Sequence, residues 1–456
     1  MFLIAFSIIS WIIHTEISIL VPNPYMDEVF HIPQTIKYLM GNFSWDPKIT
    51  TPPGLYLFVL GFKSMLDFIQ PFHQSFQLWF KMIDWHSPTT LRVINIIFGL
   101  LTMYLIQKII KLNKNSHFEA FIISLFPISF FFNQLFYTDS GSTFFVMLSY
   151  YHARHQNYFT SAFASLISIW FRQNNVIWMV FIAIVSGIAV LNSKCHSRDW
   201  CQVLTPESFT HFLQLLKHFL FDLLAFLPHL IARLYPFLLN AVGFIVFVYW
   251  NGGVVLGDKS NHQMSPHIPQ LFYFFSFTGL FAFFHLNPFK SLRILFAKLG
   301  HIRTWLIIGS IMAVMGLIVK NFTIGHPFLL ADNRHVTFYI WKTFFKTSGV
   351  IRYCLIPFYL FAMYICLTAL IKKKHFLWII AYLMCLSLVL IPSPLIEFRY
   401  FIIPYLLFRL NINTQGTLAL MAEGIIYGLV NAVVFGLFLY RPFQWPHEPG
   451  LQRFMW

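Results

Sequence analysis

The sequence predicts an all-α polytopic membrane protein with about 11–13 transmembrane helices. Of its 456 residues, 58% are hydrophobic and 10% are charged, whereas charged residues make up roughly 25% of an ordinary soluble domain. Apolar runs of about 20 residues, long enough to cross a bilayer, recur along the whole chain. The chain has 31 basic and 16 acidic residues. In a membrane protein this excess is expected to mark cytosolic loops rather than a nucleic-acid-binding surface.

The spans are expected to form one membrane domain over residues 1–456. Residues 2–20 lack the basic leader and the small-residue cleavage site of a removed signal peptide, so we interpret them as a retained first span. Loops rich in lysine and arginine then define the cytosolic side. These basic clusters lie near residues 108–114, 194–198, 290–303 and 372–374, and the stretch 192–227 is interpreted as a cytosolic loop.

The opposite side, interpreted as luminal, carries three polar segments. Residues 21–90 form a long first luminal loop in which interfacial helices are expected, and residues 251–270 and 321–348 form two further loops. Beyond residue 398 the charge pattern does not determine on which side of the membrane the chain lies. The first loop therefore becomes the main region in which to look for chemistry.

The first loop concentrates polar residues that membrane burial does not explain, in PYMDEVFHIPQTIKYLMGNFSWDPKITTPPGLY. Apolar residues recur at spacings of three and four between residues 29 and 40, which predicts a short helix. Asp27 is placed to cap its start, and Gly41 is placed to end it. This helix is too short and too polar to span a bilayer, so it should lie in the interface with its acidic residues at the start.

Acidic residues gather on the predicted luminal side, and a luminal active site with a carboxylate as general base explains this gathering. Asp27 and Glu28 are the candidates for the base. Other polar residues on this side are candidates for substrate contacts, namely His31, Asp46, Asp258 and Asp332. The structural alternative is that Asp27 only caps a helix, that Glu28 only complements the helix dipole, and that other acids simply follow solvent.

The segment ADNRH, residues 331–335, follows an apolar run and places an arginine beside a histidine. At a membrane surface, Arg334 and His335 can bind a phosphate through charge-assisted hydrogen bonds, as a lipid-phosphate leaving group would require. The alternative for Arg334 is contact with lipid headgroups alone. Arg399 is a further candidate for substrate binding, although Glu397 two residues earlier favours a local ion pair.

Other motifs give weaker indications of function. The tripeptides that begin at Asn42 and Asn321 are candidate glycosylation sites on the predicted luminal side. Cys195, His196 and Cys201 lack a second ligand pair at zinc-finger spacing, so a reduced surface loop is favoured over a metal site. The sequence contains no P-loop, dinucleotide-binding glycine motif, Ser-His-Asp pattern or HExxH, and we predict neither a metal nor a cofactor.

Several motifs occur in an order that resembles a known family. They are PYMDEVFHIPQ, WDPKITTPPGLY, YTDSGST, FRQNNVIW, NGGVVLGDKSNH, LLADNRHVTFYIWK, LIEFRYFIIPY and LQRFMW. Together they resemble the dolichyl-phosphate-glucose-dependent α-1,2-glucosyltransferases of the endoplasmic reticulum, which add the third, terminal glucose to the lipid-linked oligosaccharide used in protein N-glycosylation. The resemblance extends along nearly the whole chain.

The resemblance implies a multi-pass membrane fold of the glycosyltransferase class C type, with the catalytic carboxylate in the first luminal loop. The donor would be dolichyl phosphate β-glucose, and the acceptor would be a diglucosylated oligosaccharide on dolichyl diphosphate. A β-linked donor and an α-linked product require inversion with one base. Asp27 and Glu28 occupy the acidic motif, and Arg334 and His335 would contact the donor phosphate. No nucleotide, metal or other cofactor is implied.

Two other functions are compatible with many spans and polar residues. A channel or transporter would explain His14 and Glu16 within the first span, but it explains the acidic first loop less well. A related lipid-phosphate-sugar mannosyltransferase would share the same helical bundle. The motifs favour glucose, whereas general physical chemistry does not separate the two hexoses.

Overall fold

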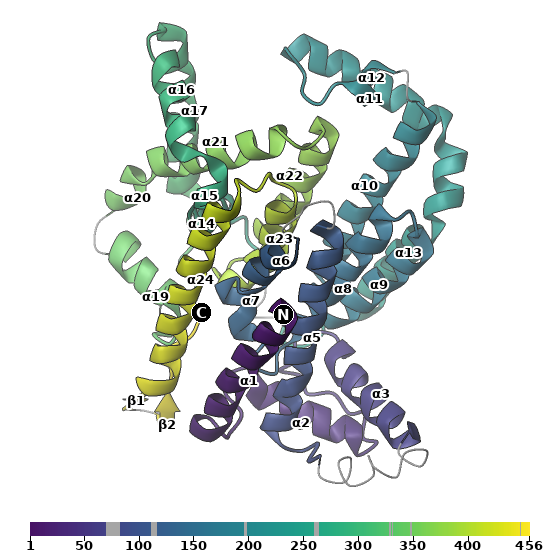
Figure 1. Ribbon diagram of the computed structural model, residues 1–456, viewed down its shortest axis with the longest axis vertical. Coiled ribbons are helices and arrows are strands. Elements are labelled where there is room, and N and C mark those ends of the chain that lie inside the picture. Colours follow the sequence, from purple (N-terminus) through teal and green to yellow (C-terminus); the bar gives the residue numbers. More distant parts are fainter. Residues whose placement is uncertain are drawn as a thin grey trace. The chain divides into compact units, whose positions relative to one another are not determined.

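The computed structural model describes residues 1–69, 83–110, 116–195, 198–259, 264–327, 330, 332–346, 349–446 and 448–456. Within these segments the chain is almost entirely helical (Figure 1). It groups into two compact units. The first unit contains Met1–Ile182 and Leu234–Gln263, and the second contains Ala183–Arg233 and Met264–Trp456. Helices α10 (Asn175–Lys194) and α13 (Leu227–Asn251) contribute residues to both units.

Seven helical stretches in the described part of the chain are long and apolar enough to cross a membrane, which makes this a multi-pass membrane protein. Besides α10 and α13 they are α1 (Phe2–Leu20), α5 (Pro88–Ile110), α17 (Ile302–Phe322), Ile351–Ile371 and α24 (Thr417–Tyr440). Three shorter helices are also apolar, namely α9 (Tyr158–Phe171), α14 (Gln270–Phe281) and α22 (Phe376–Leu390). The prediction of an all-α polytopic membrane protein is confirmed.

The first unit surrounds an aromatic core. Its remaining helices are α2 (Glu28–Leu39), α3 (Gly54–Ile69), α6 (Ser116–Ser124), α7 (Pro127–Phe132) and α8 (Thr138–Arg154). Helix α8 packs against both α5 and α9. Phe98 of α5 lies edge-on to Phe171 of α9, with ring centroids 5.6 Å apart, and Phe145 of α8 contacts both rings. The buried core also includes Tyr56 and Val59 of α3, so the first loop is anchored on the membrane helices.

One long apolar run does not form a continuous helix. Residues 118–136 are apolar enough for a span, but they contain α6 and α7 with an interruption at Leu125 and Phe126. Pro127 at the start of α7 lacks an N–H group, and its ring excludes a continuous helix through the preceding turn. Phe126 is fully buried. The interruption therefore lies inside the protein, where main-chain groups at a break can be satisfied.

The second unit contains the remaining elements. They are α11 (Asp199–Gln202), α12 (Phe209–Ala225), α15 (Phe283–Leu286), α16 (Pro288–Lys298), α19 (Val336–Ile340), the π-helix η2 (Trp341–Lys346), α20 (Ile351–Cys354), α21 (Ile356–Ile371), the 3₁₀-helix η3 (Phe398–Phe401), α23 (Ile402–Leu410), β1 (Phe443–Trp445) and β2 (Glu448–Gln452). A buried cluster joins α14, α17 and α21 through Phe272, Met315, Val319, Ile356 and Tyr359.

The stretch 192–227, interpreted from the sequence as a loop, holds α11 and α12. The buried indole of Trp200 donates to Asp222 Oδ2 at 2.8 Å and so joins these two helices. His375, just before α22, bonds the main-chain oxygen of Trp200 at 2.6 Å. These buried contacts explain why the stretch is structured although its sequence carries no strong motif.

The C-terminal segment returns to the predicted phosphate-binding residues. In the short hairpin of β1 and β2, Phe443 pairs with Gln452. Beyond β2, the Met455 N–H donates to the Arg334 oxygen at 2.8 Å. At the other end of α24, Lys373 donates to the Ile412 oxygen at 2.7 Å. Helix α24 therefore connects the end of the second unit that holds the basic cluster at 372–374 to the end that holds Arg334.

This arrangement predicts opposite accessibility for two engineered cysteines. Helix α24 has 24 residues and rises about 36 Å, enough to cross a hydrocarbon core of about 30 Å. In a background with the exposed Cys354 replaced by serine, Lys372→Cys and Gln444→Cys should react with a membrane-impermeant thiol reagent from opposite sides of sealed vesicles. Reaction of both cysteines from the same side would contradict the crossing of α24.

Candidate active site

Asp27 stands at the start of α2 in a strained turn. Met26 has φ +54°, in the left-handed region that residues with a side chain rarely adopt. The Tyr25 N–H donates to Glu28 Oε2 at 3.0 Å, and the Asp27 N–H donates to the Tyr137 hydroxyl at 3.1 Å. Asp27 is partly exposed, and its side chain makes no capping hydrogen bond with α2. Capping therefore does not explain this carboxylate, and adjacent backbone strain is typical of functional sites.

Glu28 has a different environment, because its side chain is fully buried against Arg92 of α5. Arg92 Nε donates to Oε1 at 2.9 Å and Nη2 donates to Oε2 at 2.6 Å. The Phe136 N–H also donates to Oε1, at 2.7 Å. Arg92 in turn donates to the main-chain oxygens of Val21 and Asn23. The fold thus gives the two neighbouring acids different surroundings. Glu28 joins four chain segments, while Asp27 keeps contact with solvent.

His31 lies one turn after Asp27 and belongs to an aromatic group. Its Nδ1 is 2.6 Å from the Tyr56 hydroxyl, and its ring centroid is 6.3 Å from that of Tyr137. Burial raises the pKa of Tyr56 well above its usual value, so this hydroxyl stays protonated and can donate to Nδ1. Tyr137 therefore contacts both Asp27, through its hydroxyl, and His31, through its ring.

The Asp46 loop is fixed from two directions. The Gln34 side chain of α2 donates to the Ser44 oxygen at 2.8 Å and accepts from the Asp46 N–H at 3.2 Å. On the other side the loop packs against Gly257, where a Cβ atom would lie 2.2 Å from the Ile49 oxygen. Only glycine permits this approach. The first unit therefore brings the segment of the predicted luminal loop that contains Asp258 against the loop that contains Asp46.

A third polar group joins the motifs YTDSGST and FRQNNVIW. Arg172 Nη1 lies 2.9 Å from Asp139 Oδ1, and Arg172 Nε donates to Thr138 Oγ1 at 3.2 Å. Asn175 donates to Ser142 Oγ at 2.7 Å. Thr138 directly follows Tyr137, so this polar group begins one residue after the tyrosine that contacts Asp27 and His31.

In the second unit, Arg334 is a cation held on three sides. Its Nε donates to Asp332 Oδ1 at 2.8 Å, and its Nη2 donates to Oδ2 at 2.7 Å. Its Nη1 donates to Gln452 Oε1 at 3.0 Å, and the indole of Trp445 lies 4.5 Å from its Cζ atom. Burial alone would raise the pKa of Asp332, but hydrogen bonds from Arg334 hold this pKa below its usual value. Asp332, predicted to bind substrate, is thus an ionised partner of Arg334.

The C-terminal segment also fixes the neighbours of Arg334. His335 Nδ1 donates to the main-chain oxygen of Trp456 at 2.7 Å, while its Nε2 lies 3.7 Å from Asp332 Oδ2. The Trp445 N–H donates to Asn333 Oδ1 at 2.7 Å. The adjacency of Arg334 and His335 in sequence is therefore kept in space, with both side chains partly exposed.

The remaining predicted residues have simpler surroundings. Arg399 forms an ion pair with Glu397, so the local pair that the sequence favoured is confirmed. Asn42 is exposed in the turn after α2, where its Oδ1 accepts from the Ser44 N–H. Asn321 is exposed in the last turn of α17. His196, considered with Cys195 and Cys201, lies outside the described residues, and the five cysteines are free thiols.

Sequence reasoning missed several partners. Arg92 lies in an apolar run, and a charge at such a position requires a partner, so a search for its acid could have found Glu28. Tyr137 stands directly before TDSGS and carries no comparable signal. Trp445 and Gln452 are more than 100 residues from Arg334, and no local pattern connects them.

Comparison with known proteins gives full-length matches. The chain is similar to proteins named Dol-P-Glc:Glc(2)Man(9)GlcNAc(2)-PP-Dol alpha-1,2-glucosyltransferase from three distant sources. The human protein is 37% identical, covering 98% of this chain and 96% of the relative. The Arabidopsis thaliana protein is 34% identical, covering 98% of each, and the Yarrowia lipolytica protein is 33% identical, covering 97% and 95%. No solved structure matches the chain.

A family model described as the DIE2/ALG10 family matches residues 21–410. This range begins just after α1 and includes both Asp27 and Arg334. The resemblance derived from the motifs is thereby confirmed, and we conclude that this protein belongs to the DIE2/ALG10 family.

Proposed function

We propose that this protein is a dolichyl-phosphate-glucose-dependent α-1,2-glucosyltransferase of the endoplasmic reticulum membrane, with its active site on the luminal side. It transfers glucose from dolichyl phosphate glucose to the diglucosylated oligosaccharide on dolichyl diphosphate. The observation that carries the proposal is similarity along 97–98% of the chain to the named human, plant and yeast relatives. Exposed polar groups on a multi-pass membrane protein suit a reaction between two lipid-linked substrates.

Asp27 is the proposed general base. The acceptor hydroxyl has a pKa far above 7, so a carboxylate must accept its proton as the oxygen bonds to the anomeric carbon. Asp27 is supported by its partial exposure and by the fixed turn around it. Glu28 is less suited because both of its oxygens already accept hydrogen bonds. We therefore assign Glu28 to the positioning of Asp27.

Arg334 and His335 are proposed to bind the donor phosphate. As the bond from the anomeric carbon to the phosphate oxygen breaks, its electron pair leaves with dolichyl phosphate, whose negative charge grows. A guanidinium already fixed by Asp332, Gln452 and Trp445 stabilises that charge without rearrangement. His335 can donate from Nε2 when protonated, because Nδ1 already bonds Trp456.

The activity itself is testable with purified protein. Incubation with dolichyl phosphate glucose and the diglucosylated lipid-linked oligosaccharide should give a product longer by one glucose, joined by an α-1,2 bond. Dolichyl phosphate mannose should not replace the donor. Transfer of mannose instead would support the mannosyltransferase alternative, and sugar or ion transport without glycosyl transfer would support a transporter.

Replacement of Asp27 and replacement of Glu28 should have different consequences. Asp27→Asn should lower kcat by about 10² to 10⁴ with little change in thermal stability, because it removes the base and leaves the turn intact. Glu28→Gln should lower stability instead, since breaking a buried ion pair costs about 3–5 kcal/mol. The double variant Glu28→Leu with Arg92→Met should recover part of that loss. Near-normal kcat in Asp27→Asn would exclude Asp27 as the base.

Replacement of Arg334 should affect binding and chemistry together. Arg334→Ala should raise the donor KM and lower kcat, by about 10² to 10³ in kcat/KM, because phosphate charge increases towards the transition state. Arg334→Lys should retain part of the activity. Arg293→Ala on the exposed surface of α16 is the matched control. Unchanged donor kinetics in folded Arg334→Ala would remove Arg334 from the site.

A further inference from the structure

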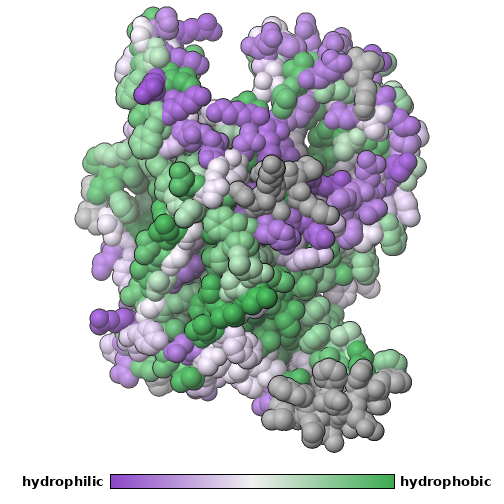
Figure 2. Space-filling view, in the orientation of Figure 1, coloured by the Kyte–Doolittle hydropathy of each residue, from purple (hydrophilic) through white to green (hydrophobic). Residues whose placement is uncertain are grey.

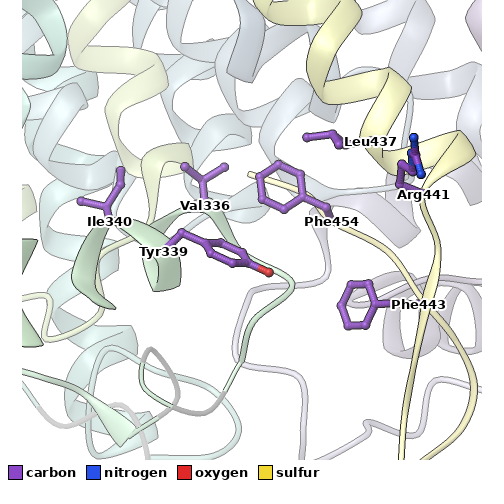
Figure 3. Close-up of a pocket in the computed structure, with 7 residues that line it drawn as sticks. All are labelled: Val336, Tyr339, Ile340, Leu437, Arg441, Phe443 and Phe454. Carbon is purple, nitrogen blue, oxygen red and sulfur yellow. The ribbon is translucent and has the colours of Figure 1, made fainter. Parts of the chain in front are cut away.

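A pocket of about 410 Å³ opens in the second unit, within the size range of small-molecule sites. Helix α19, the end of α24 and the C-terminal segment form its walls (Figure 3). Six of its lining side chains are aliphatic or aromatic, and the seventh is a cation. They are Val336, Tyr339, Ile340, Leu437, Phe443, Phe454 and Arg441. The pocket is therefore suited to a hydrocarbon chain rather than to a sugar.

This pocket borders the Arg334 group through bonded neighbours. Val336 directly follows His335, and its N–H donates to the Met455 oxygen at 3.2 Å. Phe443 pairs with Gln452 in the hairpin, and Gln452 holds the Arg334 guanidinium. An apolar cavity and a fixed cation are thus built from the same short segments. A hydrocarbon chain attached to a phosphate matches this arrangement, because its apolar part would lie in the cavity and its phosphate beside the cation.

Arg441 adds positive charge at the edge of the pocket. It follows the last residue of α24, opposite Ile340 in Figure 3, and it is exposed. Within the described residues its side chain has no hydrogen-bond or ion-pair partner. Along α24, hydrophobic side chains are exposed (Figure 2), among them Ile425, Leu429 and Val433. Arg441 therefore stands where the apolar face of α24 ends, and it places a cation beside the apolar pocket.

We infer that this pocket binds the first isoprene units of the donor's polyprenyl chain, with Arg441 at its rim close to the donor phosphate. The inference rests on the proposed function, because it takes Arg334 and His335 as the phosphate site. The donor is chosen over a membrane phospholipid because the pocket adjoins those residues. Isoprene units buried between aromatic and aliphatic side chains contribute affinity in proportion to the area removed from water.

The experiment is a chain-length series of polyprenyl phosphate glucose donors, assayed with the full-length protein in detergent. With unaltered protein, KM should fall as the first isoprene units are added. Leu437→Trp fills the pocket and should remove this dependence, raising KM for long-chain donors about tenfold or more while leaving the shortest donor unchanged. Phe454→Ala, which removes a wall, should weaken the same dependence. Arg441→Gln should raise KM for donors of every length, because all carry the phosphate.

The matched control is Ile425→Trp, also on α24 but 12 residues earlier and 61% exposed, about 18 Å along the helix. It should keep the chain-length dependence. A KM independent of chain length in unaltered protein, or equal effects of Leu437→Trp and Ile425→Trp, would overturn the inference. So would a selective effect of Leu437→Trp on the acceptor KM, relief of the Leu437→Trp effect by excess phospholipid, or unchanged KM values in Arg441→Gln. Failure of the proposed function would differ, since unaltered protein would then transfer no glucose from any donor.

Discussion

The buried ion pair between Glu28 and Arg92 is the interaction on which the first unit's candidate site depends. Both side chains are completely removed from solvent, and such a pair is tolerable only when its remaining donors and acceptors are satisfied. Here Tyr25, Phe136, Val21 and Asn23 satisfy them. The pair therefore fixes the end of α1, the start of α2, α5 and the chain before α8 relative to one another.

That constraint explains how Met26 can keep a left-handed conformation. Such a residue costs about 1–3 kcal/mol and persists only where its surroundings determine it. Arg334 in the second unit is also fixed by its neighbours: the ionised carboxylate of Asp332, the amide of Gln452 and the indole of Trp445 surround its guanidinium. In both units several hydrogen bonds hold a charged group in one position. Rigid, prearranged charges are what transfer between two lipid-linked substrates requires.

Hydropathy was sufficient to predict α1 and the multi-pass class of the protein, because a span needs about 20 apolar residues whatever lies beside it. The break before Pro127 was not predicted, since hydropathy does not distinguish an apolar run that crosses lipid from one buried in protein. Asp27, Glu28 and Arg334 were found because local spacing placed polar residues together. The distant partners Arg92 and Gln452 were not, because Arg92 is 64 residues from Glu28 and Gln452 is 118 from Arg334. Only packing brings such residues into contact.

The contacts of the C-terminal segment have a consequence for biosynthesis. Residues 443–456 follow α24 in the chain, so they are translated later than α24 and can reach Arg334 only after that helix has been made. A nascent chain can therefore hold α24 while the Arg334 group still lacks Trp445, Gln452 and Trp456. Completion of the helix and completion of the Arg334 group are separate events, and a chain stopped between them would contain α24 without these three residues.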